Sequence, residues 1–246
     1  MTDSLPLVGI VVLNWNGKDC LSQCLSSLQN LHYERFFIVV VDNASTDDSL
    51  LMAEQQFPQC IFISHTENKG FAAGMNSGIR EALSKGAEWV WIFNNDAVAD
   101  EKALAHLVQA GREVSRAGLV SPWIVDPGSQ KLWFGQGRID WLRMRVIHTT
   151  PKKKARTAPF YESQFVTGCA LLIKRALIEE VGYLDERFFL YYEDADLSHR
   201  ARQAGFRALV VPPARVMHRE QSQENPEKLY FLVYSGLLFF QKQATW

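Results

Sequence analysis

Residues 36–49 read FFIVVVDNASTDDS, an apolar run that stops abruptly at Asp42. Residues 8–17, VGIVVLNWNG, and residues 89–96, WVWIFNND, have the same pattern, in which a β-branched or aromatic run is followed by Asn or Asp. Near-continuous apolar runs that alternate with helical spacing are typical of parallel strands covered on both faces. The sequence therefore predicts an α/β fold with a mostly parallel central sheet and helices on both faces.

The remaining elements are expected to follow in the same alternation. The predicted elements are a strand at 61–64, a helix at 72–83, regular structure at 165–173, helices at 175–181 and from about 194 to before 205, and a strand at 208–211. Residues 121–159 lack periodicity, so we expect an irregular excursion there with a mobile basic loop at 151–158. The pair Pro212-Pro213 predicts a turn that leads to a loop carrying His218. We find no internal repeat or linker, and we expect one domain with segments at about 1–120, 121–220 and 221–246.

The composition excludes several classes of protein. The 246 residues are 47% hydrophobic, and 26 Lys and Arg against 27 Asp and Glu give a net charge of -1. This balance argues against disorder and against a nucleic-acid-binding protein. Four cysteines without CxxC spacing are typical of reduced intracellular thiols. There is no evident N-terminal signal, and the apolar run at 229–240 is shorter than the ~20 residues of a membrane-spanning helix, so we expect a cytoplasmic protein.

The polar strand ends predict a ligand site. The carboxyl ends of parallel strands meet at one edge of a sheet, and Asn14, Asp42-Asn43 and Asn94-Asn95-Asp96 would all lie there. Asn and Asp also simply end strands in turns, but three such ends on successive strands favour a site. We expect a nucleotide crevice, in which Asp42 accepts a hydrogen bond from a base or ribose. In Asn68-Lys69-Gly70, the ammonium group of Lys69 and the backbone N–H groups would contact phosphate oxygens.

The acid Asp96 and the acidic cluster at 193–196 are candidates for chemistry. Asp96 is the best metal candidate, because a divalent cation beside a diphosphate needs only one or two carboxylates. His218 could complete the metal shell. In residues 193–196, Glu-Asp-Ala-Asp, three acids would raise a carboxylate pKa as a general base requires, although an acidic helix start would explain them equally simply. Asp196 is expected to be a structural acid.

Glycines recur at every fourth position in residues 70–78. This pattern is not GxGxxG, which disfavours a Rossmann dehydrogenase. Close packing of a helix explains it as well as a phosphate loop does, and both interpretations stay open here.

Seven segments in this order resemble the family 2 glycosyltransferases with a GT-A fold, particularly their rhamnosyltransferase-like branch. The segments are VGIVVLNWNG, VVVDNASTDDS, ENKGFAAGMNSGI, WIFNNDA, FVTGCALLIKR, VGYLDERFFLYYEDADLSHRARQAGF and VPPARVMH. They cover about residues 8–100 and 165–218, and leave out the basic middle and the C-terminal tail. Within this resemblance, residues 1–120 are expected to bind the nucleotide sugar and residues 121–220 the acceptor, with a helical tail at 221–246.

The resemblance implies a role for each matching residue. It makes Asp194, beside Glu193, the catalytic base and puts Asp96 and His218 in the shell of Mg²⁺ or Mn²⁺. The expected donor-contact residues are Asn14, Asp42, Asn43, Asn68, Lys69, Gly70, Asn76, Asn94 and Asn95. The family's DxD motif reads Asn94-Asn95-Asp96 here, so its first carboxylate is missing.

The implied activity is an inverting transfer of one sugar from a nucleotide-diphosphate sugar to an acceptor hydroxyl. dTDP-rhamnose and UDP-sugars are the expected donors, and a saccharide or lipid-linked saccharide in polysaccharide or glycolipid assembly is the expected acceptor. The alternatives are a non-catalytic nucleotide-sugar-binding module and a sugar-1-phosphate nucleotidyltransferase. The oligomeric state remains open. So does a peripheral contact with the inner face of a membrane, through the basic loop 152–156 and the apolar segment 229–240.

Overall fold

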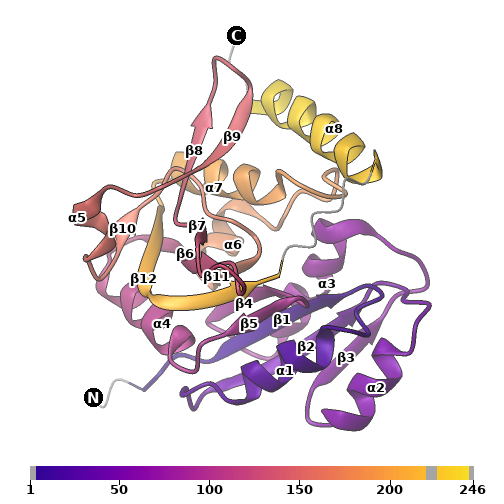
Figure 1. Ribbon diagram of the computed structural model, residues 1–246. Coiled ribbons are helices and arrows are strands. Elements are labelled where there is room, and N and C mark those ends of the chain that lie inside the picture. The colour runs from indigo at the N-terminus through magenta and orange to yellow at the C-terminus, as the bar shows by residue number, and fades with distance from the viewer. Residues whose placement is uncertain (1–3, 220–225, 244–246) are drawn as a thin grey trace.

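The computed structural model describes residues 4–219 and 226–243, and ten of its strands form one sheet (Figure 1). The strands are β1 (Val8–Asn14), β2 (Phe36–Asp42), β3 (Ile61–Ser64), β4 (Trp89–Asn94), β5 (Ala97–Ala99), β6 (Ala117–Val125), β7 (Leu132–Phe134), β8 (Gln136–Asp140), β9 (Arg145–Thr149), β10 (Tyr161–Glu162), β11 (Ala170–Lys174) and β12 (Arg207–His218). The helices are α1 (Leu21–Gln29), α2 (Ser49–Gln56), α3 (Gly70–Ser84), α4 (Ala103–Glu113), α5 (Lys153–Arg156), α6 (Arg175–Val181), α7 (Glu193–Gln203) and α8 (Pro226–Gln243). The α/β prediction is confirmed.

The sheet has a parallel part and a mixed part. Its order is β10-β12-β6-β11-β4-β1-β2-β3, with β5 paired to β12 and β7 paired to β6. From β4 to β3 all pairs are parallel, whereas β11 runs antiparallel between β4 and β6. In register, Asn14 lies beside Asp42, and Leu13 lies beside Asn94. The polar ends of β1, β2 and β4 therefore meet at one edge, as predicted.

The middle of the chain is more regular than the sequence indicated. The prediction of an irregular excursion at 121–159 was wrong, because this segment forms most of β6, all of β7, the separate β8–β9 hairpin and the short helix α5. The strands of the hairpin are only five residues each and mix apolar residues with arginines, so no long apolar run marks them. The basic loop expected at 151–158 contains α5.

The strand before His218 is also longer than expected. The prediction of a turn at Pro212-Pro213 was wrong, because β12 continues through both prolines to His218. The register with β6 shifts between Val211 and Arg215, and such irregularities accommodate residues that cannot donate a backbone hydrogen bond. His218 therefore lies on a strand, opposite Ala97 of β5, and not in a loop.

Two glycines of α3 allow close packing on the sheet. A Cβ added at Gly74 would lie 2.5 Å from a methyl carbon of Leu13, and one at Gly78 would lie 2.2 Å from Val11 and 2.9 Å from Val41. The packing interpretation of these two glycines is therefore the one that the structure supports.

We expect Gly78→Ala to destabilise the protein, because the helix must move away from Val11 and Val41 to admit the methyl group. Overpacking costs about 1–3 kcal/mol, and the better helix propensity of Ala offsets up to about 1 kcal/mol of this. Thermal denaturation should show a lower melting temperature. Gly128→Ala is the control, since only Asp126 lies near its added Cβ, at 3.6 Å. Equal melting temperatures for the two variants would contradict the packing role.

Candidate active site

A cavity of about 870 Å³ lies at the polar edge of the sheet. It is enclosed by the loop after β1, the end of β4, the segment before β11, the end of β12, the start of α7 and the N-terminal half of α8. Its lining includes Asn16, Gly17, Asp19, Phe71, Asn94, Asn95, Asp96, Trp133, His148, Thr167, Gly168, Cys169, Tyr191, Tyr192, Glu193, Asp194, His218, Arg219, Lys228 and Leu232. Six of the predicted site residues are in this set, from three distant parts of the sequence.

Asn14 joins the three strand ends beneath the cavity. Its amide nitrogen donates to Asp42 Oδ1 at 2.9 Å, and its amide oxygen accepts from Asn95 Nδ2 at 3.0 Å. The backbone N–H of Ser45 donates to the other oxygen of Asp42 at 2.9 Å. Asn14 and Asp42 are thus buried, with their polar atoms paired to protein. They support the floor of the cavity and do not line it.

Asp96 and His218 lie together on one wall. Asp96 Oδ1 is 3.1 Å from His218 Nε2, yet this contact lacks hydrogen-bond geometry, and we treat it as an ion pair. Burial lowers the pKa of His218, but the Cys169 thiol and the Asp96 carboxylate raise it more, to about 11. Asp96 Oδ1 and His218 Nδ1 are both buried without a hydrogen-bond partner.

This pair fits a divalent cation held partly by a substrate. The 3.1 Å between the carboxylate oxygen and the imidazole nitrogen is close to the ~3 Å between neighbouring ligands in an octahedral shell with bonds of ~2.1 Å. The buried Asp96 Oδ1, which lacks a hydrogen-bond partner, would be a ligand of the cation there. Among the described residues, no group of three or more His, Cys, Asp or Glu side chains gathers at one metal position. The protein alone therefore offers an incomplete shell.

The Glu193-Asp194 pair begins α7 on the opposite wall. Tyr191 and Tyr192 precede it with φ of 68° and 69°, a backbone region that bulky residues seldom adopt and that needs support from the surrounding structure. Backbone N–H groups of Gly168 and Ala195 donate to the two oxygens of Asp194, at 2.9 and 2.7 Å. The half-buried carboxylate is therefore fixed in orientation at the cavity surface.

Burial raises the pKa of both acids. For Asp194, the N–H groups of Gly168 and Ala195 and the charge of His148 oppose the increase only in part. Glu193 is 5% exposed, and the nearby Asp194 raises its pKa further. A carboxylate with a raised pKa is a better proton acceptor, as a general base requires.

Residues 168–169 connect the two walls. Gly168 N–H donates to Asp194, and the carbonyl of Cys169 accepts from the N–H of Asn94 at 2.9 Å. A Cβ on Gly168 would lie 3.5 Å from the Cβ of Asp194, so the chain passes close to α7 here. The candidate base and the candidate metal loop are therefore held by the same segment.

Besides Asn14 and Asp42, five more predicted donor-contact residues lie outside this cavity lining: Asn43, Asn68, Lys69, Gly70 and Asn76. The amide of Asn43 donates to Asn68 Oδ1 at 2.8 Å and to the carbonyl of Gly70 at 3.1 Å, and its oxygen accepts from the N–H of Lys69 at 3.1 Å. These contacts tie β2 to the start of α3. Asn76 is fully buried and bonds both the carbonyl and the N–H of Leu184. The structure gives this set a supporting position, and we leave it out of the proposed site.

Other lining residues were missed by the sequence analysis. His148 of β9 stands among the rings of Trp133, Phe134 and Phe165, with centroids 4.9, 5.0 and 5.9 Å away. Trp133 also contacts His218, at 4.9 Å. Arg219 and Lys228 add positive charge at the cavity. Of these residues, only Arg219 could have been found from the sequence, because it directly follows the candidate ligand His218.

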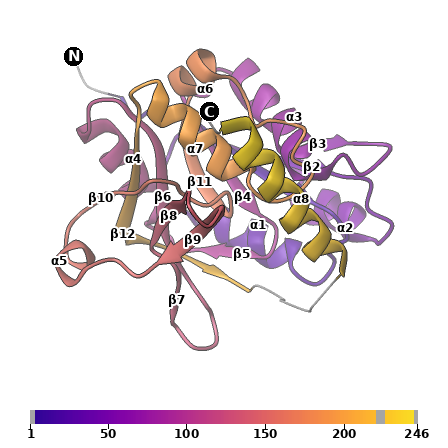
Figure 2. The same cartoon turned by 90° about the horizontal axis from the view of Figure 1, so that it is seen from above.

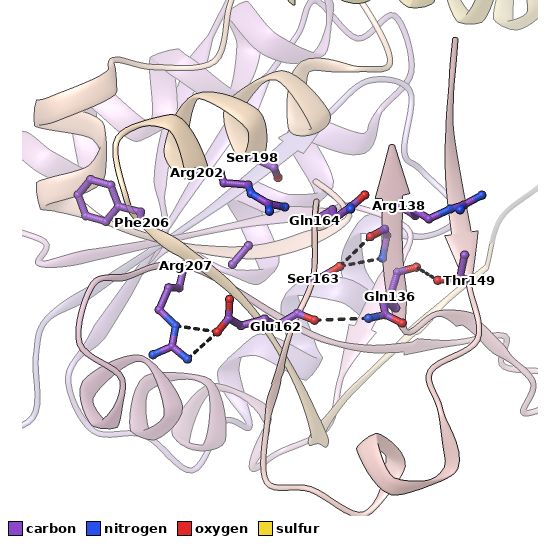
Figure 3. Close-up of a pocket in the computed structure, with 12 residues that line it drawn as sticks. Gln136, Arg138, Thr149, Glu162, Ser163, Gln164, Ser198, Arg202, Phe206 and Arg207 are labelled. Atoms are coloured by element: carbon purple, nitrogen blue, oxygen red, sulfur yellow. Dashed lines mark hydrogen bonds and ion pairs between the residues drawn. The ribbon is translucent and has the colours of Figure 1, made fainter. Parts of the chain in front are cut away.

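A second cavity, of about 420 Å³, lies between the β8–β9 hairpin, β10 and the later turns of α7 (Figure 3). Its Glu162 is paired with Arg207 at 2.6 Å, and Ser163 Oγ is bonded to the backbone of Gly137. None of the predicted site residues lines it. The larger cavity is therefore the candidate active site.

Comparison with known proteins agrees with this geometry. Residues 9–182 match the family described as "Glycosyl transferase family 2". The chain belongs to this family. The resemblance inferred from the seven sequence segments is thus confirmed, and the chain is a glycosyltransferase domain.

This family 2 chain has relatives of known activity. It is 28% identical over 240 residues to the N-acetylglucosaminyl-diphospho-decaprenol L-rhamnosyltransferase of Mycobacterium tuberculosis, a match of 89% of this chain and 77% of that protein. It is 22% identical over 214 residues to the poly-beta-1,6-N-acetyl-D-glucosamine synthase of Staphylococcus aureus, a match of 86% of this chain and 50% of that protein.

Solved structures share the fold. GalNAc-T7 with UDP, GalNAc and Mn²⁺ superposes with a TM-score of 0.77 at 18% identity, over 94% of this chain and 47% of that one. The mannosyltransferase PcManGT from Pyrobaculum calidifontis, with GDP-Man and Mn²⁺, superposes with a TM-score of 0.72 at 19% identity. This match covers 99% of this chain and 66% of that one. The chain spans about half the length of GalNAc-T7 and of the staphylococcal synthase. The GT-A fold expected from the sequence is confirmed.

Proposed function

We propose that this family 2 domain transfers one sugar from a nucleotide-diphosphate sugar to an acceptor hydroxyl, with inversion at the anomeric carbon. One observation carries the proposal: a single cavity holds the Asp96–His218 pair on one wall and Asp194, fixed by two backbone N–H groups, on the other. Charge neutralisation and proton removal are the two tasks that such a transfer demands.

Asp194 is the proposed base. Its carboxylate takes the proton from the acceptor hydroxyl as that oxygen bonds to the anomeric carbon. The bond from this carbon to the diphosphate oxygen breaks, and the nucleoside diphosphate leaves with the electron pair. Direct displacement by the acceptor oxygen, without a covalent intermediate on the enzyme, is the proposed course. Burial raises the pKa of Glu193 beside it, which favours the neutral form of this second acid.

Asp96 and His218 are the proposed ligands of Mg²⁺ or Mn²⁺. The bound ion would neutralise the charge that develops on the departing diphosphate. His218 must give up the proton that Asp96 and Cys169 favour, so metal binding should release a proton. Because Asn94 and Asn95 bring no charge, the protein's own affinity for the metal is expected to be weak without nucleotide. Arg219 and Lys228 are placed to add positive charge near the diphosphate.

The donor and acceptor classes come from the relatives. The mycobacterial relative is named for rhamnosyl transfer to a diphospho-decaprenol-linked sugar. We accordingly propose dTDP-rhamnose as donor, with UDP-sugars next, and a lipid-linked saccharide as acceptor. The loop residues Asn16 and Gly17, which line the cavity above Asn14, are the proposed neighbours of the nucleoside. Asp42 would then act on the nucleoside indirectly, through the network that holds this loop.

A thermal-shift panel of dTDP- and UDP-sugars, each with and without Mn²⁺, tests the binding half of the proposal. A donor at a hundred times its Kd stabilises the native state by about 2.7 kcal/mol, which corresponds to a rise of roughly 5–10 °C in melting temperature. We expect Asp96→Asn and His218→Ala to lose the metal-dependent part of this rise, because each removes one protein ligand.

His32→Ala is the control for these variants, since His32 is exposed and pairs with Glu101 away from the cavity. It should respond as the wild type does. A metal-dependent rise that survives in Asp96→Asn would remove this carboxylate from the proposed metal shell.

A further inference from the structure

We propose that the outer face of α8 and the tip of the β8–β9 hairpin form one docking surface for an anionic lipid bilayer. The surface consists of Leu229, Tyr230, Val233, Tyr234 and Leu237 on α8, and of Trp141, Leu142, Arg143 and Met144 at the tip, with Arg138 and Arg145 beside it. In Figure 1 the hairpin and α8 stand at the same end of the molecule, and Figure 2 looks onto this end.

The outer face of α8 is apolar and open. Its five residues recur at three- and four-residue spacing and lie along one side of the helix. They are between 50% and 62% exposed, and none carries a charge. The other side of α8 is packed, with Ser235 and Phe239 fully buried. A folded protein seldom leaves such a continuous apolar stripe facing water unless it meets a partner.

The hairpin tip extends this face. Trp141 packs on Phe239 and Phe240 of α8, with ring centroids 5.8 and 5.6 Å away. Beyond it, Leu142 is 89% exposed and Met144 56% exposed. Two apolar side chains at the tip of a hairpin that is itself anchored on α8 make the two elements one surface.

Charge identifies the partner as anionic. Arg138, Arg143 and Arg145 surround the tip with side chains 56%, 65% and 56% exposed. The acid among them is Asp140, whose side chain is 9% exposed and lies 3.3–3.8 Å from all three guanidinium groups. The tip thus presents excess positive charge beside the apolar face. Apolar residues and tyrosines flanked by arginines are the pattern of a helix that lies in the membrane interface.

The position of α8 fits a lipid partner better than a second copy of the chain. Lys228 and Leu232 face the candidate active cavity, whereas Leu229 and Val233, one position further along α8, face outward. A bilayer against the outer face would bring a lipid-linked acceptor to the cavity mouth, an argument that rests on the proposed function. No described helix is long and apolar enough to cross the bilayer, so the contact would be at its surface.

The basic helix α5 is not part of this surface. It lies far from α8 in both views (Figures 1 and 2). The basic loop 152–156 was expected to contact a membrane together with the apolar segment 229–240. In the proposed surface, the arginines of the hairpin supply the positive charge instead.

Vesicle co-sedimentation tests the surface without any nucleotide sugar, so its outcome does not depend on the proposed transfer. Wild-type protein should bind vesicles of mixed phosphatidylcholine and phosphatidylglycerol, with binding that weakens as salt is raised. The double variant L142E/L237E should lose roughly tenfold or more in binding. R143Q/R145Q should lose the salt-sensitive part. Leu51→Glu is the matched control, since Leu51 is 56% exposed on α2 and should have no effect.

Three results would each overturn the proposal. The first is wild-type protein that does not bind anionic vesicles, and the second is an L51E variant that loses as much binding as L142E/L237E. The third is light scattering that shows a wild-type dimer which L237E converts to a monomer, because the face would then be the interface between two copies. Circular dichroism of each variant checks that it is folded.

Discussion

Replacing Asp194 by Asn is expected to lower the rate of sugar transfer by roughly 10²–10⁴-fold, the usual contribution of a positioned general base. The amide keeps the shape of the side chain and can still accept the N–H of Gly168, so the start of α7 should stay folded although the N–H of Ala195 loses its acceptor. It cannot take the proton of the acceptor hydroxyl. Donor binding, measured by the metal-dependent thermal shift, should therefore be unchanged while turnover falls.

The pH dependence gives a second readout of the same residue. The pKa of Asp194 is raised by burial, and the base works only when deprotonated. As the pH is lowered, the wild-type rate should therefore begin to fall at a higher pH than it would with an aspartate of ordinary pKa. Above that pH the rate should stay high. Glu179→Gln is the control, since its exposed side chain pairs with Arg175 on α6. Turnover of Asp194→Asn equal to that of this control would remove Asp194 from the mechanism.

Replacing Asp196 by Ala is expected to cost about 3–5 kcal/mol of stability, because it breaks a buried ion-pair network. The carboxylate is fully buried, with one oxygen 2.8 Å from Arg200 and the other 2.6 Å from Lys242. These partners have side chains only 18% and 21% exposed. Arg200 would lose its carboxylate partner, Lys242 would keep only Asp185, and α8 would lose its ion pair with α7. The prediction of a structural role for this acid agrees with these contacts.

Chemical denaturation of Asp196→Ala measures this loss. The control is Asp48→Asn, which breaks the ion pair with Lys18, whose side chains are 67% and 51% exposed. Exposed pairs contribute about 0–1 kcal/mol, so this variant should stay close to the wild type. Similar losses in the two variants would mean that the buried network contributes little. Asp196→Ala should also weaken vesicle binding, since it loosens α8.

Local sequence patterns pointed to residues on both walls of the candidate site. Asp96 follows the end of an apolar strand, and the ends of strands in a parallel sheet must converge, whereas Asp194 was identified from its acidic cluster and from the family resemblance. His218, singled out by the same resemblance, lies beside Asp96, although its strand was misjudged. Prolines normally end a strand, and only the register shift against β6 lets β12 run through them. That shift depends on the neighbouring strand and leaves no mark in the local sequence.

The predicted donor contacts that lie outside the cavity lining show a different limit. Asn43 follows a strand end and Asn76 lies between two glycines, yet their amides bond to groups distant in the chain, Asn68 and Leu184. Which polar groups are already paired depends on tertiary contacts. His148 was missed for the converse reason, because the hairpin that carries it to the cavity is short and has no periodic signal.

The most direct test of the account is transfer itself. Wild-type protein would be incubated with dTDP-rhamnose or a UDP-sugar, Mn²⁺ and a short-chain N-acetylglucosaminyl-diphospho-lipid, and the products measured by mass spectrometry and proton NMR. We predict an acceptor extended by one sugar through an inverted linkage, with equal release of nucleoside diphosphate. Metal-dependent donor binding without extended acceptor or released nucleoside diphosphate would contradict catalysis and leave a nucleotide-sugar-binding module.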